Sequence, residues 1–299
     1  MTSRLQPYFA VCPGGLEAAL ADELDALGAR EVREEGGGVA FNGTRELGYA
    51  VNLYSRIASR VLWQVGRRGY TTEQHLYDAT QEVRWQDLMS AQQTLRVDVT
   101  ASRSPLKSLE FAMLRIKDGI VDRLRTLSGA RPSIDRQDPD VRVFAYLDPR
   151  TVTLYIDLSG EPLFKRGWRA DKGEAPLKEN LAAGLLALAG WTPEVPLLDP
   201  FCGSGTTLIA AELLGRDSLG IDVSADAVSD SIHHEPSNRK EESYEDKYSL
   251  FCDLRFLSKA ASQGTVPACL HGDFSPVACR AAGLGSGLRG DSAPRYYHG

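Results

Sequence analysis

A glycine-rich turn between two short apolar segments carries the residue types with the clearest chemistry. Residues 195–207 read V-P-L-L-D-P-F-C-G-S-G-T-T, so an apolar run ends at Asp199 and is followed by Gly203 and Gly205. An apolar, helix-favouring stretch comes next, and a second apolar run ends at Asp222, 23 residues after Asp199. This pattern predicts a buried strand, a tight turn, a helix and a second strand, with glycines that let a ligand approach the backbone. A carboxylate at the end of the second strand is placed to accept hydrogen bonds from both hydroxyls of a ribose.

Three kinds of nucleotide site compete for this turn. A phosphate-binding P-loop needs a lysine after its glycines, and residues 203–207 contain none. The G-x-G-x-x-G of a dinucleotide site is broken because Leu208 stands where the third glycine belongs. The string at 199–206 instead resembles the cofactor loop of class I S-adenosylmethionine-dependent methyltransferases. In those enzymes the first acidic residue faces the amino acid end of the cofactor and the glycines face its ribose.

Five further strings agree with one family in order and spacing. Together they resemble the THUMP-domain methyltransferases that modify guanine N2 of bacterial 23S ribosomal RNA, over roughly residues 5–228; the strings lie at 55–60, 112–122, 157–160, 165–169 and 175–183. The implied fold class is α/β and α+β. The implied organisation is a ferredoxin-like N-terminal region at 1–65, a THUMP RNA-binding domain at 66–165, the start of a Rossmann-like methyltransferase domain at 166–230 and a divergent tail at 231–299.

The resemblance also implies a cofactor and its contacts. The cofactor is S-adenosylmethionine, and its contacts carry over to Asp199, Pro200, Cys202, Gly203, Gly205, Thr206 and Asp222. Glu179 and Asn180, beside Lys178, match a helix that borders the same pocket. Methyl transfer from a sulfonium needs mainly alignment of donor and acceptor, so no catalytic triad is expected.

RNA is the expected partner, and four cations are its candidate contacts. Arg115 and Lys117 lie on the polar face of a predicted helix, where cations could follow a phosphate backbone. A solvated helix face is the alternative interpretation of these two residues. Arg166 and Arg169 belong to one of the strings that carry the resemblance. No protein partner is evident from the sequence.

The chain departs from the family pattern after residue 228. The family requires Asn-Pro-Pro-Tyr, in which the asparagine and the following carbonyl accept from the exocyclic amine and the tyrosine stacks on a flipped base. The nearest string, D-F-S-P at 273–276, lacks the second proline and the aromatic residue, so no catalytic residue is assigned. Only 103 residues remain from Leu197 onward, fewer than a seven-stranded sheet with RNA-facing loops requires. We therefore expect an incomplete methyltransferase domain, from a truncated or frameshifted reading that the downstream DNA would test.

The elements expected to position these residues follow from apolar spacing. In the N-terminal region, strands are predicted at 8–11, 39–41 and 61–65, and helices at 16–27 and 47–58. In the second region the predictions are a strand at 95–99, a long helix at 109–127 and a hairpin of 141–146 with 151–156 around a turn at 148–150. A further helix is predicted at 177–188.

Composition excludes several classes of protein. The 299 residues are 42% hydrophobic and 25% charged, as in ordinary soluble domains, and the length favours two domains. No run approaches the ~18 apolar residues of a membrane span, and the N-terminus lacks the apolar core of a secretory signal. Five scattered cysteines favour a reducing cytoplasm over a disulfide framework.

Charge is divided unevenly between the two parts of the chain. Residues 1–170 hold 23 Lys and Arg against 22 Asp and Glu, whereas residues 171–299 hold 11 against 18. Arginine outnumbers lysine by 20 to 3 in the first part, which suits RNA because guanidinium groups bind phosphates and stack on bases. An arginine preference set by GC-rich coding is the alternative.

No metal site is expected. The tail concentrates cysteines and histidines at irregular spacings, without the paired ligands of a zinc site: Cys252, Cys269, Cys279, His233, His234, His271 and His298. Cys12 is expected in the core, and Cys202 is expected in the cofactor loop without acting as a nucleophile.

The sequence therefore predicts a methyltransferase that transfers a methyl group from S-adenosylmethionine to N2 of a guanine in 23S rRNA. The alternative is an RNA-binding THUMP protein whose methyltransferase half is inactive. A third possibility, adenine-N6 or DNA methylation, shares the cofactor loop but predicts no THUMP-like half.

Overall fold

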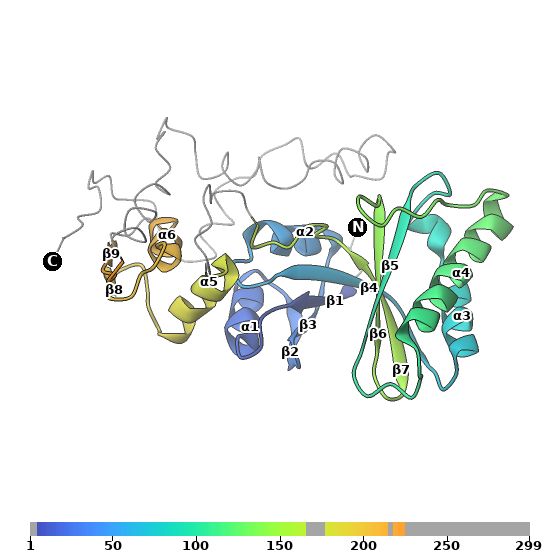
Figure 1. The fold of residues 1–299 in the computed structure, drawn as a ribbon, viewed down its shortest axis with the longest axis horizontal. Helices are drawn as coiled ribbons and strands as arrows, with labels where there is room; N and C mark the ends of the chain where they lie inside the picture. Colours follow the sequence, from blue (N-terminus) through green and yellow to red (C-terminus); the bar gives the residue numbers. More distant parts are fainter. Residues whose placement is uncertain (1–4, 166–176, 215–217, 225–299) are drawn as a thin grey trace. The chain divides into compact units, whose positions relative to one another are not determined.

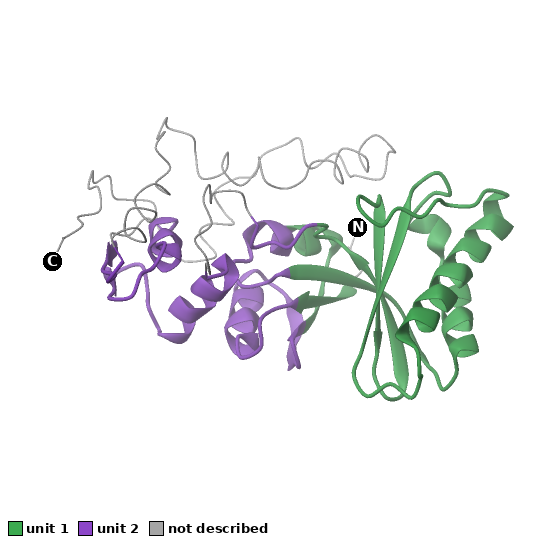
Figure 2. Ribbon diagram, in the orientation of Figure 1, with its two compact units in different colours: residues 1–10, 40–49, 60–160 green, residues 11–39, 50–59, 161–299 purple. Residues whose placement is uncertain are grey.

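The computed structural model describes residues 5–165, 177–214 and 218–224 (Figure 1). The chain divides into two compact units (Figure 2). Unit 1 comprises residues 1–10, 40–49 and 60–160, and unit 2 comprises residues 11–39, 50–59 and 161–299. None of the helices in the described ranges has both the length and the apolar character that crossing a bilayer requires.

Unit 1 is built on a mixed sheet. Its strands follow in the order β3-β1-β4-β7-β6-β5, with β3 at Gly38–Gly43, β1 at Gln6–Val11, β4 at Arg60–Gly69, β7 at Thr151–Asp157, β6 at Val141–Leu147 and β5 at Leu95–Ala101. β7 is antiparallel to β4 and to β6, while β5 runs parallel to β6. The hairpin predicted around 148–150 is confirmed. Its turn is closed because Asp148 Oδ1 accepts from the backbone N–H groups of Arg150 and Thr151, both at 2.6 Å.

Two helices cover one face of β5, β6 and β7 in unit 1 (Figure 1). They are α3 at Glu73–Glu82 and α4 at Leu109–Ser128. A short 3-10 turn at Trp85–Asp87 lies between them in the chain. A further helix, α2 at Arg45–Tyr54, lies earlier in the chain. The predicted long helix is confirmed as α4. It begins where Ser108 Oγ accepts from the Phe111 N–H at 3.2 Å, and it ends at Gly129, whose φ of 71° is left-handed. Its buried stripe recurs every four residues and joins the core of unit 1: Ala112, Ile116, Ile120 and Leu124.

The contact between α3 and α4 depends on Gly119. A Cβ at this position would lie 1.9 Å from Thr80 Oγ1, a side chain that is fully buried and donates to the Tyr77 carbonyl at 2.6 Å. Gly119→Ala is therefore expected to lower the free energy of unfolding by about 2 kcal/mol through overpacking, despite about 1 kcal/mol of gained helix propensity. Urea denaturation of the full chain measures this effect. Gly36→Ala is the control because nothing lies within 4 Å of its Cβ position, and equal midpoints for the two variants would contradict the prediction.

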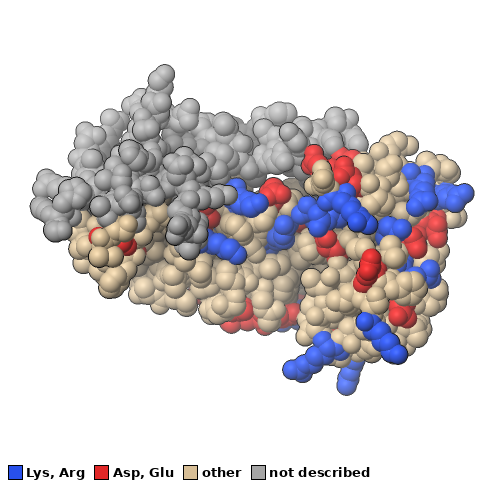
Figure 3. Space-filling model, in the orientation of Figure 1, with Lys and Arg blue, Asp and Glu red and all other residues tan. Residues whose placement is uncertain are grey.

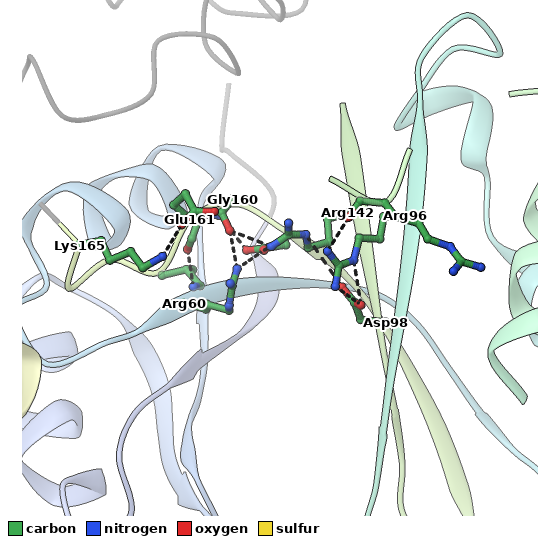
Figure 4. Close-up of polar contacts among 11 residues, drawn as sticks. Arg60, Arg96, Asp98, Arg142, Gly160, Glu161 and Lys165 are labelled. Carbon is green, nitrogen blue, oxygen red and sulfur yellow. Dashed lines mark hydrogen bonds and ion pairs between the residues drawn. The ribbon is translucent and has the colours of Figure 1, made fainter. Parts of the chain in front are cut away.

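An ion-pair network joins the first residue of β4 to the last residue of β7, and Figure 4 shows its members Arg60, Arg142 and Gly160. Arg60 Nη1 lies 2.5 Å from Asp157 Oδ2, and the Asp157 side chain is fully buried. Arg60 and Arg142 both donate to the Gly160 carbonyl oxygen, at 2.6 and 3.0 Å. Arg142 Nη1 also lies 3.9 Å from Asp157 Oδ2. One of the strings singled out in the sequence ends at Arg60 and another begins at Asp157, so this network connects them.

Unit 2 packs helices around small side chains. Its elements are α1 at Glu17–Ala26, β2 at Arg30–Glu35, α5 at Glu179–Leu188, β8 at Leu197–Asp199, α6 at Thr206–Glu212 and β9 at Ser218–Gly220. α1 lies against α5, where Leu16 occupies the space over Gly184: a Cβ there would lie 2.3 Å from Leu16 Cδ1. α5 packs on α6 through Ala182, Leu186 and Ala210.

Several elements differ from the sequence predictions. β2 and α3 were not predicted, since β2 has five charged residues in six and α3 has a largely polar surface. The strand predicted before Asp199 is present, but the prediction that it is buried is wrong. β8 is short, and Leu198 is 57% exposed because β8 pairs with β9 alone in the part of the chain that the structure describes.

Candidate functional site

The predicted strand, turn, helix and strand are confirmed as β8, α6 and β9. β8 and β9 run parallel, with Asp199 opposite Gly220. The pairing continues past the strand ends, because Ile221 N donates to the Asp199 carbonyl and Cys202 N donates to the Ile221 carbonyl, both at 2.9 Å. Residues 200–205 therefore lie at the carboxyl ends of both strands, the position at which ligands bind in open α/β sheets.

Two aspartates are held by the loop itself. Asp199 accepts from Phe201 N at 3.0 Å and from the Thr207 hydroxyl. Asp222 accepts from Ser224 N through Oδ1 and from Gly203 N through Oδ2, each at 2.9 Å. A carboxylate has about four lone-pair sites, so each group keeps acceptor capacity for a ligand. The structure thus brings two predicted cofactor residues to one loop, with Asp222 bonded directly to the glycine turn.

The backbone hydrogen bonds of Asp222 predict that its carboxylate stays ionised, and that cofactor affinity stays constant, between pH 7 and pH 5. The N–H groups of Ser224 and Gly203 stabilise the carboxylate and hold its pKa below the ordinary aspartate value. A depressed folded-state pKa means that the ionised form persists until the pH falls below about 4, the ordinary value. Affinity for S-adenosylmethionine is therefore expected to stay constant between pH 7 and pH 5, as titration calorimetry at several pH values would measure. A fall in affinity centred near pH 6 would contradict this assignment.

The glycines leave room on the loop. Gly203 and Gly205 have φ values of 51° and 76°, in the left-handed region that favours glycine. Nothing described lies within 4 Å of a Cβ built on Gly203. A side chain at Gly220, by contrast, would meet Leu208 and Cys202 at 2.4 and 2.8 Å. Gly203 therefore provides an open approach to the backbone, and Gly220 provides close packing beneath it.

Cys202 lies in this packed layer. The residue is 7% exposed, and burial, with the nearby carboxylates of Asp199 and Asp222, raises the pKa of its thiol. A thiol with a raised pKa is a weaker nucleophile at neutral pH, and the role of Cys202 as a loop residue stays a prediction.

The start of α5 lies beside the start of α6. The Thr206 hydroxyl lies 3.4 Å from the Leu177 carbonyl oxygen, just before α5. Asn180, in the first turn of α5, is 1% exposed, and its Nδ2 donates to the Ile57 carbonyl at 3.3 Å. Its Oδ1 is buried and has no hydrogen-bond partner among the described residues. An unsatisfied buried acceptor is costly, so this oxygen calls for a donor that a bound molecule can supply. Glu179 precedes it and is partly exposed.

Sequence reasoning missed the residues that hold these helices together. Glu23 on α1 accepts from the Ser55 hydroxyl at 2.6 Å and from Arg56 N at 2.7 Å. Arg56 Nη2 in turn donates to the Ala210 carbonyl on α6 at 2.9 Å. The Ile57 carbonyl accepts the hydrogen bond from Asn180 Nδ2 on α5. The string at 55–60 was the available signal, but spacing alone did not show that this turn contacts α1, α5 and α6.

The candidate RNA contacts on α4 are engaged within unit 1. Arg115 Nη2 donates to Gln74 Oε1 at 2.7 Å, and its guanidinium lies 4.8 Å from the centre of the Tyr77 ring. Lys117 Nζ lies 2.9 Å from Asp118 Oδ1, and the lysine side chain is 22% exposed. Arg166 and Arg169 lie outside the described residues. In the described ranges, no three His, Cys, Asp or Glu side chains gather as metal ligands would.

Family models match three consecutive segments of the chain. Residues 7–62 match the RlmL ferredoxin-like domain, residues 70–157 the THUMP domain and residues 166–262 the RMKL-like methyltransferase domain. Among curated relatives, the ribosomal RNA large subunit methyltransferase K/L of Cellvibrio japonicus is 46% identical over 218 residues, and that of Syntrophotalea carbinolica is 46% identical over 215. These alignments cover 71% and 70% of this chain but 29% and 30% of the relatives, so the chain spans less than a third of their length.

Solved structures agree on the fold. A protein described as a predicted N6-adenine-specific DNA methylase from Listeria monocytogenes aligns with a TM-score of 0.69 at 27% identity, covering 77% of this chain and 71% of that one. SMU.472, solved in complex with SAH, aligns with the same TM-score at 24% identity, covering 85% of this chain and 74% of that one. The expected fold class and the resemblance to a THUMP-domain methyltransferase family are confirmed by these matches.

Proposed function

We propose that this chain, which matches the models of a THUMP domain and of an RMKL-like methyltransferase domain, methylates RNA with S-adenosylmethionine as donor. The proposed acceptor is N2 of a guanine in 23S rRNA. The observation that carries the proposal is the glycine loop after β8, with the Asp222 carboxylate bonded to Gly203 N at 2.9 Å. The domain boundaries near 65, 165 and 230 are part of the same proposal.

The residues of the loop fit an adenosyl cofactor. Asp199 would accept from the amino acid end, Asp222 would accept from the ribose hydroxyls, and the open side of Gly203 would admit the sugar close to the backbone. Asn180 Oδ1, which has no hydrogen-bond partner among the described residues, offers one further acceptor in the first turn of α5. Pro200, Cys202, Gly205 and Thr206 shape the loop, and Glu179 borders it. When bound, the cofactor supplies an electrophilic sulfonium methyl group, and the protein contributes orientation.

The identity of the methyl acceptor is the more specific part of the proposal. The curated relatives carry names of rRNA large subunit methyltransferases, whereas the Listeria protein carries the name of a DNA methylase. The THUMP match favours RNA as the substrate, with unit 1 contributing shape and phosphate contacts. We assign no catalytic residue, since the chain contains no Asn-Pro-Pro-Tyr string.

One experiment separates the candidate functions. The full chain is incubated with radiolabelled S-adenosylmethionine and under-methylated 23S rRNA, and the product nucleoside is identified by digestion and mass spectrometry. N2-methylguanosine supports the proposal, and N6-methyladenosine overturns its acceptor. Cofactor and RNA binding without transfer supports the alternative function, an RNA-binding protein with an inactive methyltransferase half.

A further inference from the structure

One end of unit 1 gathers cationic side chains from three separate segments. This loop end comprises residues 67–70 at the end of β4, 102–108 before α4 and 148–150 between β6 and β7. Lys and Arg side chains project from the lower end of unit 1, where the turn between β6 and β7 lies (Figures 1 and 3). The segments contribute five cations: Arg67, Arg68, Arg103, Lys107 and Arg150.

A single buried tyrosine ties the three segments together. Tyr70 is 2% exposed, and its backbone N donates to the Arg150 carbonyl at 2.9 Å. Its hydroxyl lies 2.7 Å from Ser104 Oγ and 2.8 Å from the Asp148 carbonyl oxygen. The cations are therefore carried on loops with a defined arrangement, which lowers the entropy cost of binding a ligand with several of them at once.

Most of this positive charge faces solvent without a partner. Arg103, Lys107 and Arg150 are exposed, and none of them forms an ion pair with a described residue. The Arg67 side chain is 60% exposed and lies 4.0 Å from Asp148, while Arg68 is paired with Glu82 at 2.6 Å. Four carboxylates lie on these segments, pair with them or follow them within three residues, namely Asp148, Glu82, Glu110 and Glu73, against five cations, so the loop end is net positive.

An exposed aromatic side chain adjoins the cations. Tyr146 is 40% exposed near the end of β6, where it is registered opposite Thr153, and Thr153 is registered opposite Arg67 on β4. Tyr146 and Arg67 therefore lie in one row across the sheet, on either side of β7. Cations that contact phosphates, beside an aromatic ring that stacks on a base, are the combination that binds single-stranded nucleic acid.

We propose that the loop end binds a single-stranded segment of the RNA substrate. Arg67, Arg103, Lys107 and Arg150 contact its phosphates, and Tyr146 stacks on an unpaired base. This inference rests on the proposed function, in that unit 1 holds RNA for the methyltransferase domain. It assigns the contact to the loop end instead of the α4 face that carries Arg115 and Lys117.

Binding of a fluorescein-labelled 12-nucleotide single-stranded RNA to the full chain tests the inference. Arg103→Glu/Arg150→Glu is expected to weaken binding at least about tenfold in 0.1 M salt, and to lower the slope of log affinity against log salt by about 1.4. The matched control is Arg131→Glu/Arg136→Glu, which makes the same charge change at exposed positions before β6, at the opposite end of that strand. Tyr146→Ala is expected to lose at least about fivefold in affinity, and Tyr146→Phe is expected to retain it.

The outcomes distinguish the two proposals. Loss in the loop-end variant with retention in the control supports the inference. Equal affinity of both double variants, or preference for duplex RNA of the same length, overturns the loop-end assignment and leaves the proposed function standing. Failure of the unmodified chain to bind RNA overturns both.

Discussion

Replacing Asp222 with alanine is expected to lower the affinity for S-adenosylmethionine by at least about a hundredfold while leaving RNA affinity unchanged. Two ribose hydroxyls would lose a charged acceptor, and each such bond contributes about 1.5–3 kcal/mol. The substitution also removes the acceptor for Gly203 N and Ser224 N, so the turn itself loses two backbone hydrogen bonds. Titration calorimetry with the full chain measures the cofactor affinity, and the labelled 12-nucleotide RNA measures RNA affinity.

Two further variants complete this experiment. Asp22→Ala removes an exposed carboxylate from α1 in the same unit and is expected to bind the cofactor normally. Asp222→Asn keeps one acceptor oxygen and the side-chain shape, so it is expected to lose less affinity than the alanine variant. An unchanged affinity in Asp222→Ala would refute the role assigned to this carboxylate.

Replacing Asp157 with asparagine is expected to lower the free energy of unfolding by about 3 kcal/mol. The carboxylate is fully buried and lies 2.5 Å from Arg60, with Arg142 at 3.9 Å. Removing one member of a buried ion pair leaves the other charge uncompensated, which costs about 3–5 kcal/mol, and the 20% exposure of Arg60 places the effect at the lower end. Guanidinium denaturation of the full chain measures the loss.

An exposed ion pair of the same unit provides the comparison. Asp87 lies 2.9 Å from Arg84, but its side chain is 49% exposed and that of Arg84 is 72% exposed. Asp87→Asn is expected to cost less than about 1 kcal/mol, because solvent screens such pairs. Similar losses of unfolding free energy for Asp157→Asn and Asp87→Asn would show that burial does not increase the contribution of the network in Figure 4 to stability.

Features with local signals were predicted correctly from the sequence. The four-residue recurrence of Ile116, Ile120 and Leu124 indicated α4, and the turn residues at 148–150 indicated the hairpin. The strand, turn and helix around Gly203 followed from an apolar run, a glycine-rich turn and a helix-favouring stretch in succession. Each of these signals lies within about one element's length of chain, where periodicity and turn chemistry determine structure.

Features set by distant contacts were not predicted. The charged strand β2 was missed for a different reason, because it lacks the apolar alternation of a half-buried strand, although its partner β3 begins only three residues after it ends. Leu198 was expected in a buried strand, but its burial depends on how many strands lie beside β8. The string at 55–60 was noticed for its resemblance, yet its contacts to Glu23 and Ala210 are 32 to 154 residues away in the chain.

The sequence by itself determined the kind of loop that follows β8, the family that the chain resembles and the carboxylates at the ends of the two strands. Tertiary structure alone decided that Asp222 is bonded to Gly203, that Asn180 Oδ1 has no hydrogen-bond partner among the described residues and that Tyr70 holds three cationic segments at one end of unit 1. The physical reason is the distance along the chain over which each kind of interaction acts. Residue type and spacing specify backbone conformation over a few residues, whereas burial, hydrogen-bond partners and summed charge depend on which distant segments the fold brings together.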